Sequence, residues 1–412
     1  MLLALGLLAT QAGAQQYTSL TLEEAERLAL SEEPGREVYI ARAEAIEEQS
    51  VAVGQLPDPQ LRVGLLNYPI ESGNFRTENM TQALLGIRQA FQPRSVRSAR
   101  TQQFSSLAAE MTENAEGRTR DVRTAVRIAW LDTYYWGRAH EIVSEARPLF
   151  DDLATVTRSL YAVGSKDRQD VLRAELELSR IDDRLIDIEK QQATARAALS
   201  EWVGTAAQRP LPENLPDWDQ APDLAVLEER LATHPALKAA DARVEAQQHG
   251  VELAQEQSKP DWAIDVGYGY RDGRLPNGDP RSDFITVIFT MDLPFFQGNR
   301  QDRELAAALG ERRAADESRD QLHRRLSSRL DSEYARGQEL GRRIDLYERL
   351  IITQTEGQAG AALTAYQSEA GDFADVMRSH IDEFESHLEL IRLKVERAQS
   401  HAVLANLGGF TP

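Results

Sequence analysis

An internal repeat constrains the fold of this 412-residue chain more than any other feature of its sequence. Three patterns occur twice and in the same order: Arg27-Leu28-Ala29 and Arg230-Leu231-Ala232, then Pro59-Gln60-Leu61 and Pro260-Asp261-Trp262, then Tyr161 and Tyr366, each followed by an Asp-Val pair at 170–171 and 375–376. Self-similarity at a fixed spacing is the signature of a duplicated structural unit. The chain is therefore predicted to be two copies of one unit.

The boundaries of the two copies follow from composition. A stretch with Pro210, Pro212, Asn214 and Pro216 is typical of a linker, which places the first repeat at 15–209, the linker at 210–221 and the second repeat at 222–412. Before the first repeat, residues 1–14 contain an apolar run that ends in Ala12-Gly13-Ala14. This pattern predicts a secretory signal peptide cut after Ala14, and hence export from the cytoplasm.

Each repeat contains a long helical hairpin, predicted at 95–203 and 299–406. In the second helix of the first hairpin, apolar or small residues recur in alternating steps of three and four, for example at Val171, Ala174, Leu178 and Ile181. This spacing indicates a coiled-coil seam. A helix near 70 residues would extend about 100 Å at roughly 1.5 Å per residue, so its apolar stripe needs partners along its whole length. Each repeat also begins with two shorter helices that can supply them.

Between the shorter helices and the hairpin, each repeat contains two amphipathic strands, predicted at 59–68, 82–91, 260–271 and 283–293. In the third, Trp262, Ile264, Val266 and Tyr268 alternate with small or charged residues. Runs of about 9 to 11 residues match the length that a tilted strand needs to cross hydrocarbon. A soluble hairpin packed on a core is the alternative interpretation, but tyrosines near the strand ends and polar connecting loops favour lipid.

Four strands cannot close a membrane-spanning sheet by themselves. Unpaired backbone amides in hydrocarbon cost several kcal/mol each, and the smallest closed barrels have about eight strands. Three copies of the chain would supply about twelve strands. The predicted fold class is therefore mainly α with a membrane β-barrel portion, in which a homotrimer forms a 12-stranded β-barrel and a 12-helix α-barrel.

Several functional classes are disfavoured by composition. The formal net charge of -19 argues against a nucleic-acid partner, and the absence of cysteine excludes lipidation at an N-terminal cysteine. The seven histidines are scattered without metal-ligand spacing, and no convergent polar constellation suggests an active site. We therefore expect no enzyme activity, no metal site and no cofactor.

The chain resembles the TolC-type outer-membrane efflux family over essentially all of its mature sequence. The resemblance is carried by the two repeats, by the segments 160–172 and 365–377, and by the junction Leu293-Pro294-Phe295-Phe296-Gln297-Gly298. It implies a trimeric exit duct in the bacterial outer membrane with a long periplasmic extension. Such a duct passively conducts substrates from an inner-membrane pump, here expected to be of RND type, through a periplasmic adaptor protein.

The resemblance also implies functional positions. Asp170, Tyr366 and Asp375 match the family's residues at the periplasmic tip, where the channel closes, and Arg378 stands where the family has a second inner aspartate. Gly371 replaces the family's bridging arginine, which leaves Arg378, beside Asp375, as a candidate for a different pair between chains. Gly164 and Gly371 mark the hairpin turns, and Pro294 and Gly298 the strand-to-helix turn. Ordinary helix caps and solvated turns are the alternative interpretation.

Two other functions remain open at this stage. The chain could be the outer channel of a type I protein secretion system, or a periplasmic coiled-coil scaffold or adaptor. Adaptors normally carry one hairpin with a lipoyl-like domain, whereas this sequence predicts two hairpins and two strand pairs. Heavy metals, drugs and secreted proteins all remain possible substrates.

Overall fold

The computed structural model describes residues 19–31, 33–165, 167–218, 220–368 and 370–411. The predicted signal peptide lies outside these residues. In the first repeat the elements are α1 (Leu22–Ser31), α2 (Pro34–Val53), β1 (Gln60–Leu66), β2 (Gln82–Phe91), α3 (Arg94–Ala162) and α4 (Arg168–Val203). A short 3-10 helix, η1 (Gly204–Gln208), follows.

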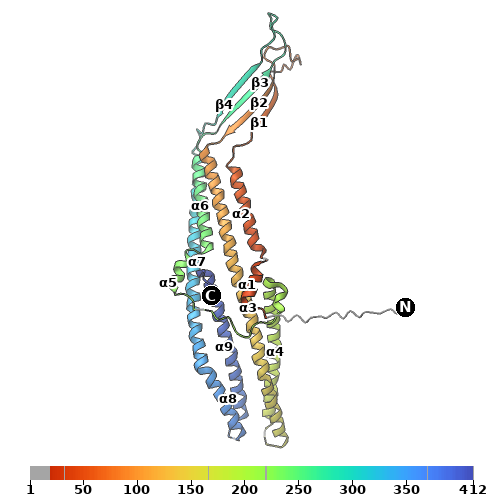
Figure 1. The fold of residues 1–412 in the computed structure, drawn as a ribbon, viewed down its shortest axis with the longest axis vertical. Coiled ribbons are helices and arrows are strands. Elements are labelled where there is room, and N and C mark those ends of the chain that lie inside the picture. Colours follow the sequence, from red (N-terminus) through yellow and green to blue (C-terminus); the bar gives the residue numbers. More distant parts are fainter. Residues whose placement is uncertain (1–18, 32, 166, 219, 369, 412) are drawn as a thin grey trace, which may run out of the picture. The chain divides into compact units, whose positions relative to one another are not determined.

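The second repeat has the same order of elements. They are α5 (Leu224–Leu231), α6 (Pro235–Glu256), β3 (Trp262–Tyr270), β4 (Phe284–Met291), α7 (Gln301–Leu346), η2 (Tyr347–Ile351), α8 (Ile352–Gln367) and α9 (Phe373–Gly408). The mainly helical fold with two long hairpins and four strands, predicted from the sequence, is confirmed (Figure 1).

One long helix of the second repeat differs from its counterpart. Where α3 is a single α-helix of 69 residues, the second repeat has a π-helical turn, η2, between α7 and α8. A π-turn accommodates one more residue than an α-turn. Val122 and Leu326 are buried equivalents before this turn, 204 positions apart, whereas Tyr161 and Tyr366 after it are 205 apart. The π-turn thus absorbs a one-residue insertion without breaking the helix.

The chain forms two compact units, and each contains segments of both repeats. The first, called here the hairpin unit, comprises Met1–Pro34, Arg118–His234 and Leu326–Pro412 as far as these are described. The second, called here the sheet unit, comprises Gly35–Gly117 and Pro235–Arg325. Helices α3 and α7 contribute to both.

The sheet unit contains one antiparallel sheet with the strand order β1-β2-β3-β4 (Figure 1). The repeats meet at its centre, where β2 of the first pairs with β3 of the second, from Ala83 opposite Tyr270 to Phe91 opposite Trp262. The last pair stacks its rings at 4.2 Å between centroids. Strands β1 and β4 are the two edges of the sheet.

The hairpin unit has two hydrophobic cores. The first surrounds Trp130, whose indole Nε1 donates a hydrogen bond of 2.9 Å to the carbonyl of Leu20. The second lies between the two hairpins and contains the predicted seam residues Ala174 and Ile181, together with Phe384 of α9. The coiled-coil seam read from the sequence is therefore the buried stripe of α4.

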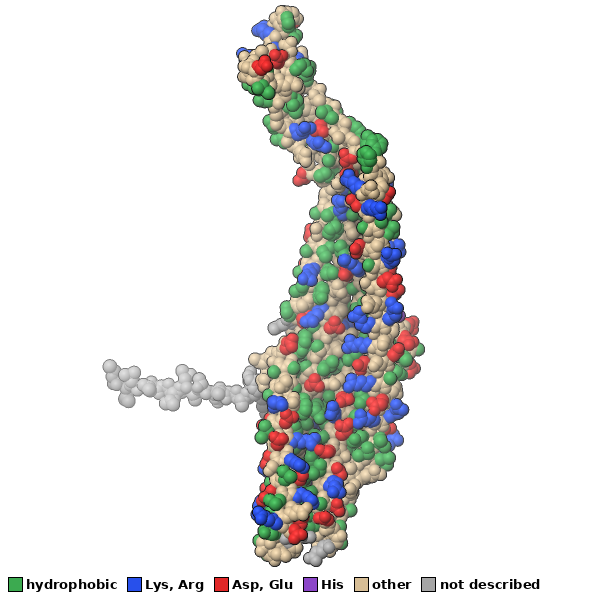
Figure 2. All heavy atoms as spheres, turned by 180° about the vertical axis from the view of Figure 1, so that it is seen from behind, with side chains coloured by type: hydrophobic (Ala, Val, Ile, Leu, Met, Phe, Trp, Pro, Cys, Tyr) green, Lys and Arg blue, Asp and Glu red, His purple; other side chains and the backbone are tan. Residues whose placement is uncertain are grey.

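Charged side chains of both signs are interspersed over the helices on the face shown in Figure 2. Such a surface remains well hydrated. In the described part of the chain, no helix is both long enough and apolar enough to cross a membrane.

A buried histidine makes the hairpin unit sensitive to pH. His234 is 6% exposed, and its Nε2 lies 3.3 Å from Oδ1 of Asn406. Burial lowers its pKa; the contact with Asn406 and the charge of Asp121 oppose this shift, and the charges of Arg120 and Arg329 add to it. The unfolded chain therefore binds a proton more readily than the folded one just below the ordinary histidine pKa of about 6.5.

We expect the free energy of unfolding to fall as the pH is lowered through this range, and the slope to diminish in His234→Gln. Chemical denaturation at a series of pH values measures it. His323→Gln, at an exposed position, is the matched control and should keep the wild-type slope. Equal slopes in all three proteins would show that His234 is not responsible.

Candidate functional site

The sheet presents a large apolar face to its surroundings. Side chains of all four strands that point to this face are exposed, including Leu61 and Val63 on β1, Ile87 on β2, Val266 on β3 and Ile285 on β4. Ile285 is 78% exposed and Val63 73%. Contiguous apolar surface of this kind marks a contact with lipid or with protein.

The opposite face of the sheet carries small and charged residues at its centre, beside the apolar side chains of Leu84, Phe284 and Ile288. Ala263 and Asp265 of β3 are buried there, and Arg62 of β1 contacts the Asp265 carboxylate at 2.5 Å. Arg88 of β2 approaches the same carboxylate at 4.0 Å. The alternation expected along β3 therefore separates an apolar face from a charged one, as a strand between lipid and water requires.

The two loops at one end of the sheet are tied together by one arginine. Arg281 is 8% exposed, and its guanidinium donates to the backbone carbonyls of Arg76, Glu78 and Asp272. Gly273 lies directly over this guanidinium with φ of +121°, a conformation that favours glycine. Arg281 thus joins the loop between β1 and β2 to the loop between β3 and β4. Sequence reasoning missed this role.

In the hairpin unit, the first hairpin turns on Gly164. This glycine has φ of +76°, its N–H donates to the carbonyl of Tyr161, and the N–H of Ser165 donates to the carbonyl of Leu160. These two bonds are the Schellman arrangement that ends a helix. The turn at Gly164 is therefore a local feature, which follows from the left-handed backbone of this glycine.

The second hairpin turns differently. Asp372 caps α9 by accepting a hydrogen bond of 3.2 Å from the backbone N–H of Ala374. Gly371 has no positive φ, but a Cβ there would lie only 3.0 Å from Cβ of Ala365 and from the backbone N of Tyr366. Gly371 is therefore required for close packing against the end of α8, not for backbone conformation.

Tyr366 packs into the hairpin unit. It is 7% exposed, its ring lies 5.5 Å from that of Phe373, and its hydroxyl lies near Thr157 of the first hairpin. Burial raises its pKa, the neighbouring Thr157 opposes this shift, and the carboxylates of Asp170 and Asp372 add to it. The structure thus brings Tyr366 and Asp170 together at the hairpin ends.

Asp375 and Arg378 pair with each other on α9. Arg378 Nη1 lies 3.4 Å from Asp375 Oδ1, and the two side chains are 69% and 64% exposed, respectively. Within a single chain this contact is made along one helix.

The strand-to-helix turn at Pro294 and Gly298 is open. Nothing lies within 4 Å of a Cβ built on Gly298, so packing within the chain does not require glycine there. Beside it, Phe295 and Phe296 are 78% and 90% exposed. These two phenylalanines are the most exposed aromatic residues described, and the sequence analysis gave them no role.

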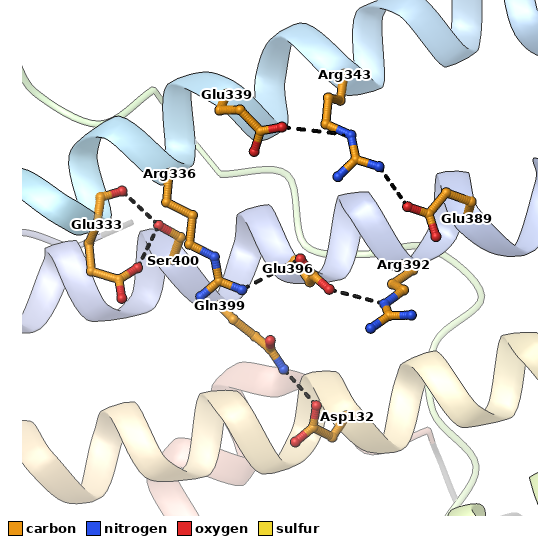
Figure 3. A network of polar contacts seen from close by, with 10 residues as sticks. All are labelled: Asp132, Glu333, Arg336, Glu339, Arg343, Glu389, Arg392, Glu396, Gln399 and Ser400. Carbon is orange, nitrogen blue, oxygen red and sulfur yellow. Dashed lines mark hydrogen bonds and ion pairs between the residues drawn. The ribbon is translucent and has the colours of Figure 1, made fainter.

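A polar network joins α3, α7 and α9 in the hairpin unit (Figure 3). Gln399 of α9 donates to the carboxylate of Asp132 of α3 at 2.6 Å, and the hydroxyl of Ser400 contacts Glu333 of α7 at 3.0 Å. Burial raises the pKa of Asp132, an effect that the Gln399 hydrogen bond opposes. The Asp132–Gln399 contact links the two repeats, and nothing in the sequence pattern indicated it.

The described residues contain no group of three or more histidine, aspartate or glutamate side chains arranged to hold a metal ion. His380 instead contacts Glu383 on its own helix at 2.9 Å, and His387 contacts Glu356 of α8 at 3.4 Å.

Comparison with known proteins agrees with this arrangement. Residues 226–409 match the family model described as outer membrane efflux protein. Among curated proteins, none matches the sequence.

Solved structures match almost the whole chain. The outer membrane protein VceC from Vibrio cholerae is 18% identical with a TM-score of 0.79, over 94% of this chain and 96% of its own. The outer-membrane channel OprN is 17% identical with a TM-score of 0.80, over 94% and 90%. The MtrE outer membrane channel of Neisseria gonorrhoeae is 15% identical with a TM-score of 0.72, over 94% and 88%.

At these identities the structural matches establish the fold, and the family model adds a sequence likeness over residues 226–409. The fold repeats across both halves of the chain, and the second half matches the family model. Residues 226–409 are therefore similar to the outer membrane efflux protein family, and the whole chain has the fold of the solved outer-membrane channels.

Proposed function

We propose that this protein is the outer-membrane exit duct of a tripartite efflux system and that it works as a homotrimer. The observation that carries the proposal is a sheet with an exposed apolar face and two open edges, β1 and β4. An apolar face suits lipid, but open edges do not, because each unpaired backbone group in hydrocarbon costs several kcal/mol. Closure with further copies of the same sheet removes both edges, and three copies give about twelve strands.

In this arrangement the small, charged face of the sheet lines the passage. Arg62, Arg88 and Asp265 would then contact water, while Val63 and Ile285 contact lipid. Transport is passive, since the chain offers a lined path and carries out no chemistry.

The helix hairpins are the proposed site of closure and of partner contact. A periplasmic adaptor and an inner-membrane pump, which we propose to be of RND type, would deliver substrate at this end. Three copies would bring Asp170 and Asp375 into rings, where crowded carboxylates attract cations. An adaptor that binds the open arrangement more tightly would shift the population towards it.

Fractionation and conductance test the proposal together. The mature protein is expected to sediment with outer membranes, to require detergent for extraction, to show three copies by native mass spectrometry, and to conduct ions in planar bilayers. A protein that stays in the soluble periplasmic fraction as a monomer would instead be a scaffold or adaptor, and the duct would be excluded.

A further inference from the structure

The strand registers show how the two repeats correspond residue by residue. Leu61 of β1 pairs with Ile87 of β2, and Trp262 of β3, the repeat counterpart of Leu61, pairs with Met291 of β4. Met291 is therefore the counterpart of Ile87, 204 positions later (291 − 87). The same shift relates the buried Val122 and Val126 of α3 to the buried Leu326 and Leu330 of α7, so it holds beyond the sheet.

The correspondence between the repeats predicts that β4 can continue beyond the residue at which it ends in the single chain. Strand β2 continues to Phe91, four residues past Ile87, because it pairs with β3 along its whole length. The counterparts of Gln89 and Phe91 are Leu293 and Phe295, but β4 ends at Met291. Among the described residues of a single copy, no strand lies beside β4 on its outer edge.

We propose that β4 of one copy pairs with β1 of the next in the register that β2 and β3 use within the chain. Within the chain Ile87, Gln89 and Phe91 lie opposite Val266, Ile264 and Trp262. Replacing each residue by its repeat counterpart places Met291, Leu293 and Phe295 opposite Leu65, Val63 and Leu61 of the next copy. The inference rests on the homotrimer proposed above and adds the alignment of its strands.

The exposure of these residues agrees with the register. All six are apolar and exposed, and Phe295 and Leu61 are 78% and 69% exposed. Residues directly opposite each other in a sheet share a face, so a register shifted by one would place apolar residues against Arg62 and Gly64. Phe295 would cover Leu61 as Phe91 covers Trp262.

Backbone hydrogen-bond directions agree independently. The N–H of Asp292 donates to the carbonyl of Asp261 on β3. Successive residues of a strand point their N–H groups to alternate sides, so those of Met291, Leu293 and Phe295 face the open edge. Pro294 has no N–H group, and its nitrogen points towards β3. The open edge of β4 therefore loses no hydrogen-bond donor.

One local bond must be exchanged. In the single chain the N–H of Phe295 donates to the carbonyl of Leu293 at 2.9 Å, which turns the backbone after β4. Extension of β4 replaces this bond by one to the next copy.

The helix that follows the strand-to-helix junction offers a further contact that is compatible with this register. Ser95 at the start of α3 lies close enough to the Glu256 carboxylate at the end of α6 to lower its pKa, after the larger effect of Lys259, and this proximity joins the repeats within the chain. The counterparts are Asn299 and Gln55, and their amides are able to form a hydrogen bond. Asn299 directly follows the exposed segment 293–296.

Cysteine cross-linking tests the register, because the chain contains no cysteine. Opposite residues in an antiparallel pair have Cα atoms about 5.5 Å apart, within disulfide reach. The double variant Val63→Cys/Leu293→Cys is expected to form covalent dimers and trimers on mild oxidation in detergent. Val63→Cys/Phe289→Cys, four residues out of register, should remain monomeric on a denaturing gel. Val63→Cys with Met291→Cys or Phe295→Cys should cross-link more slowly.

The intrachain counterpart, Gln89→Cys/Ile264→Cys, is the positive control for oxidation. It should form a disulfide visible by mass spectrometry without covalent oligomers. Native mass spectrometry of each variant before oxidation separates the two proposals. A trimer that cross-links best through position 289, 291 or 295, or through none of the four positions, overturns the register and leaves the duct standing. A protein with no trimer overturns the duct and the register together.

Discussion

Replacing Trp130 by alanine is expected to lower the free energy of unfolding of the hairpin unit by about 3–5 kcal/mol, the usual cost of truncating a fully buried tryptophan. Trp130 has no exposed surface and lies in the core with Leu131, Leu199 and Val395, which come from α3, α4 and α9. Its removal leaves a cavity that these rigid helices cannot fill. Guanidinium denaturation followed by circular dichroism measures the loss.

Two variants separate the contributions of Trp130. Trp130→Phe keeps most of the apolar volume but leaves the carbonyl of Leu20 without its 2.9 Å donor, so it should cost less than the alanine variant. Tyr161→Ala, at a 46% exposed position of the same helix, should change stability by no more than about 0.5 kcal/mol. A Trp130→Ala protein as stable as Tyr161→Ala would show that this core does not hold the hairpins together.

The sequence predicted the large elements because their periodic patterns are long. Seam positions such as Ala174 and Ile181 repeat over ten helical turns, and strands such as β3 alternate without interruption. Both signals depend only on neighbours along the chain. The same holds for the turn at Gly164, where the glycine itself allows the left-handed backbone.

The differences between the two hairpin ends were not predictable from the repeat. Tyr161 and Tyr366 occupy equivalent positions, yet the first is 46% exposed and the second 7%. The reason lies in their neighbours across the turn: Phe373 packs on Tyr366, whereas the equivalent residue in the first hairpin is Arg168. Such contacts depend on how two helices meet, which no local pattern encodes.

Arg281 shows a second limit. Its partners are backbone carbonyls about 200 residues earlier in the chain, at Arg76 and Glu78, and carbonyls have no sequence signature. The π-turn at 347–351 shows a third, because an inserted residue in a helix is visible only once the two repeats are aligned in space. Sequence periodicity therefore predicted the framework but not the contacts that distinguish one repeat from the other.

Replacing both Asp375 and Arg378 by alanine is expected to raise the single-channel conductance of the purified trimer in planar bilayers. Within one chain their ion pair is exposed, and exposed pairs contribute about 0–1 kcal/mol, so the fold should tolerate its loss. At the proposed closed end, the same charges from three chains would approach one another. Three ion pairs of about 1 kcal/mol each would raise the equilibrium ratio of closed to open channels by roughly 100-fold.

The control for this experiment is another exposed ion pair on the same repeat. Asp345 and Arg349 lie 3.2 Å apart at the junction of α7 and η2, well before the hairpin turn in the sequence, and are as exposed as Asp375 and Arg378. The double alanine variant at 345 and 349 should conduct like the wild type. Because both variants remove one charge of each sign, a difference between them reports position and not net charge. Equal conductance in all three proteins would remove Asp375 and Arg378 from the gate and leave Tyr366 and Asp170 as the remaining candidates at that end.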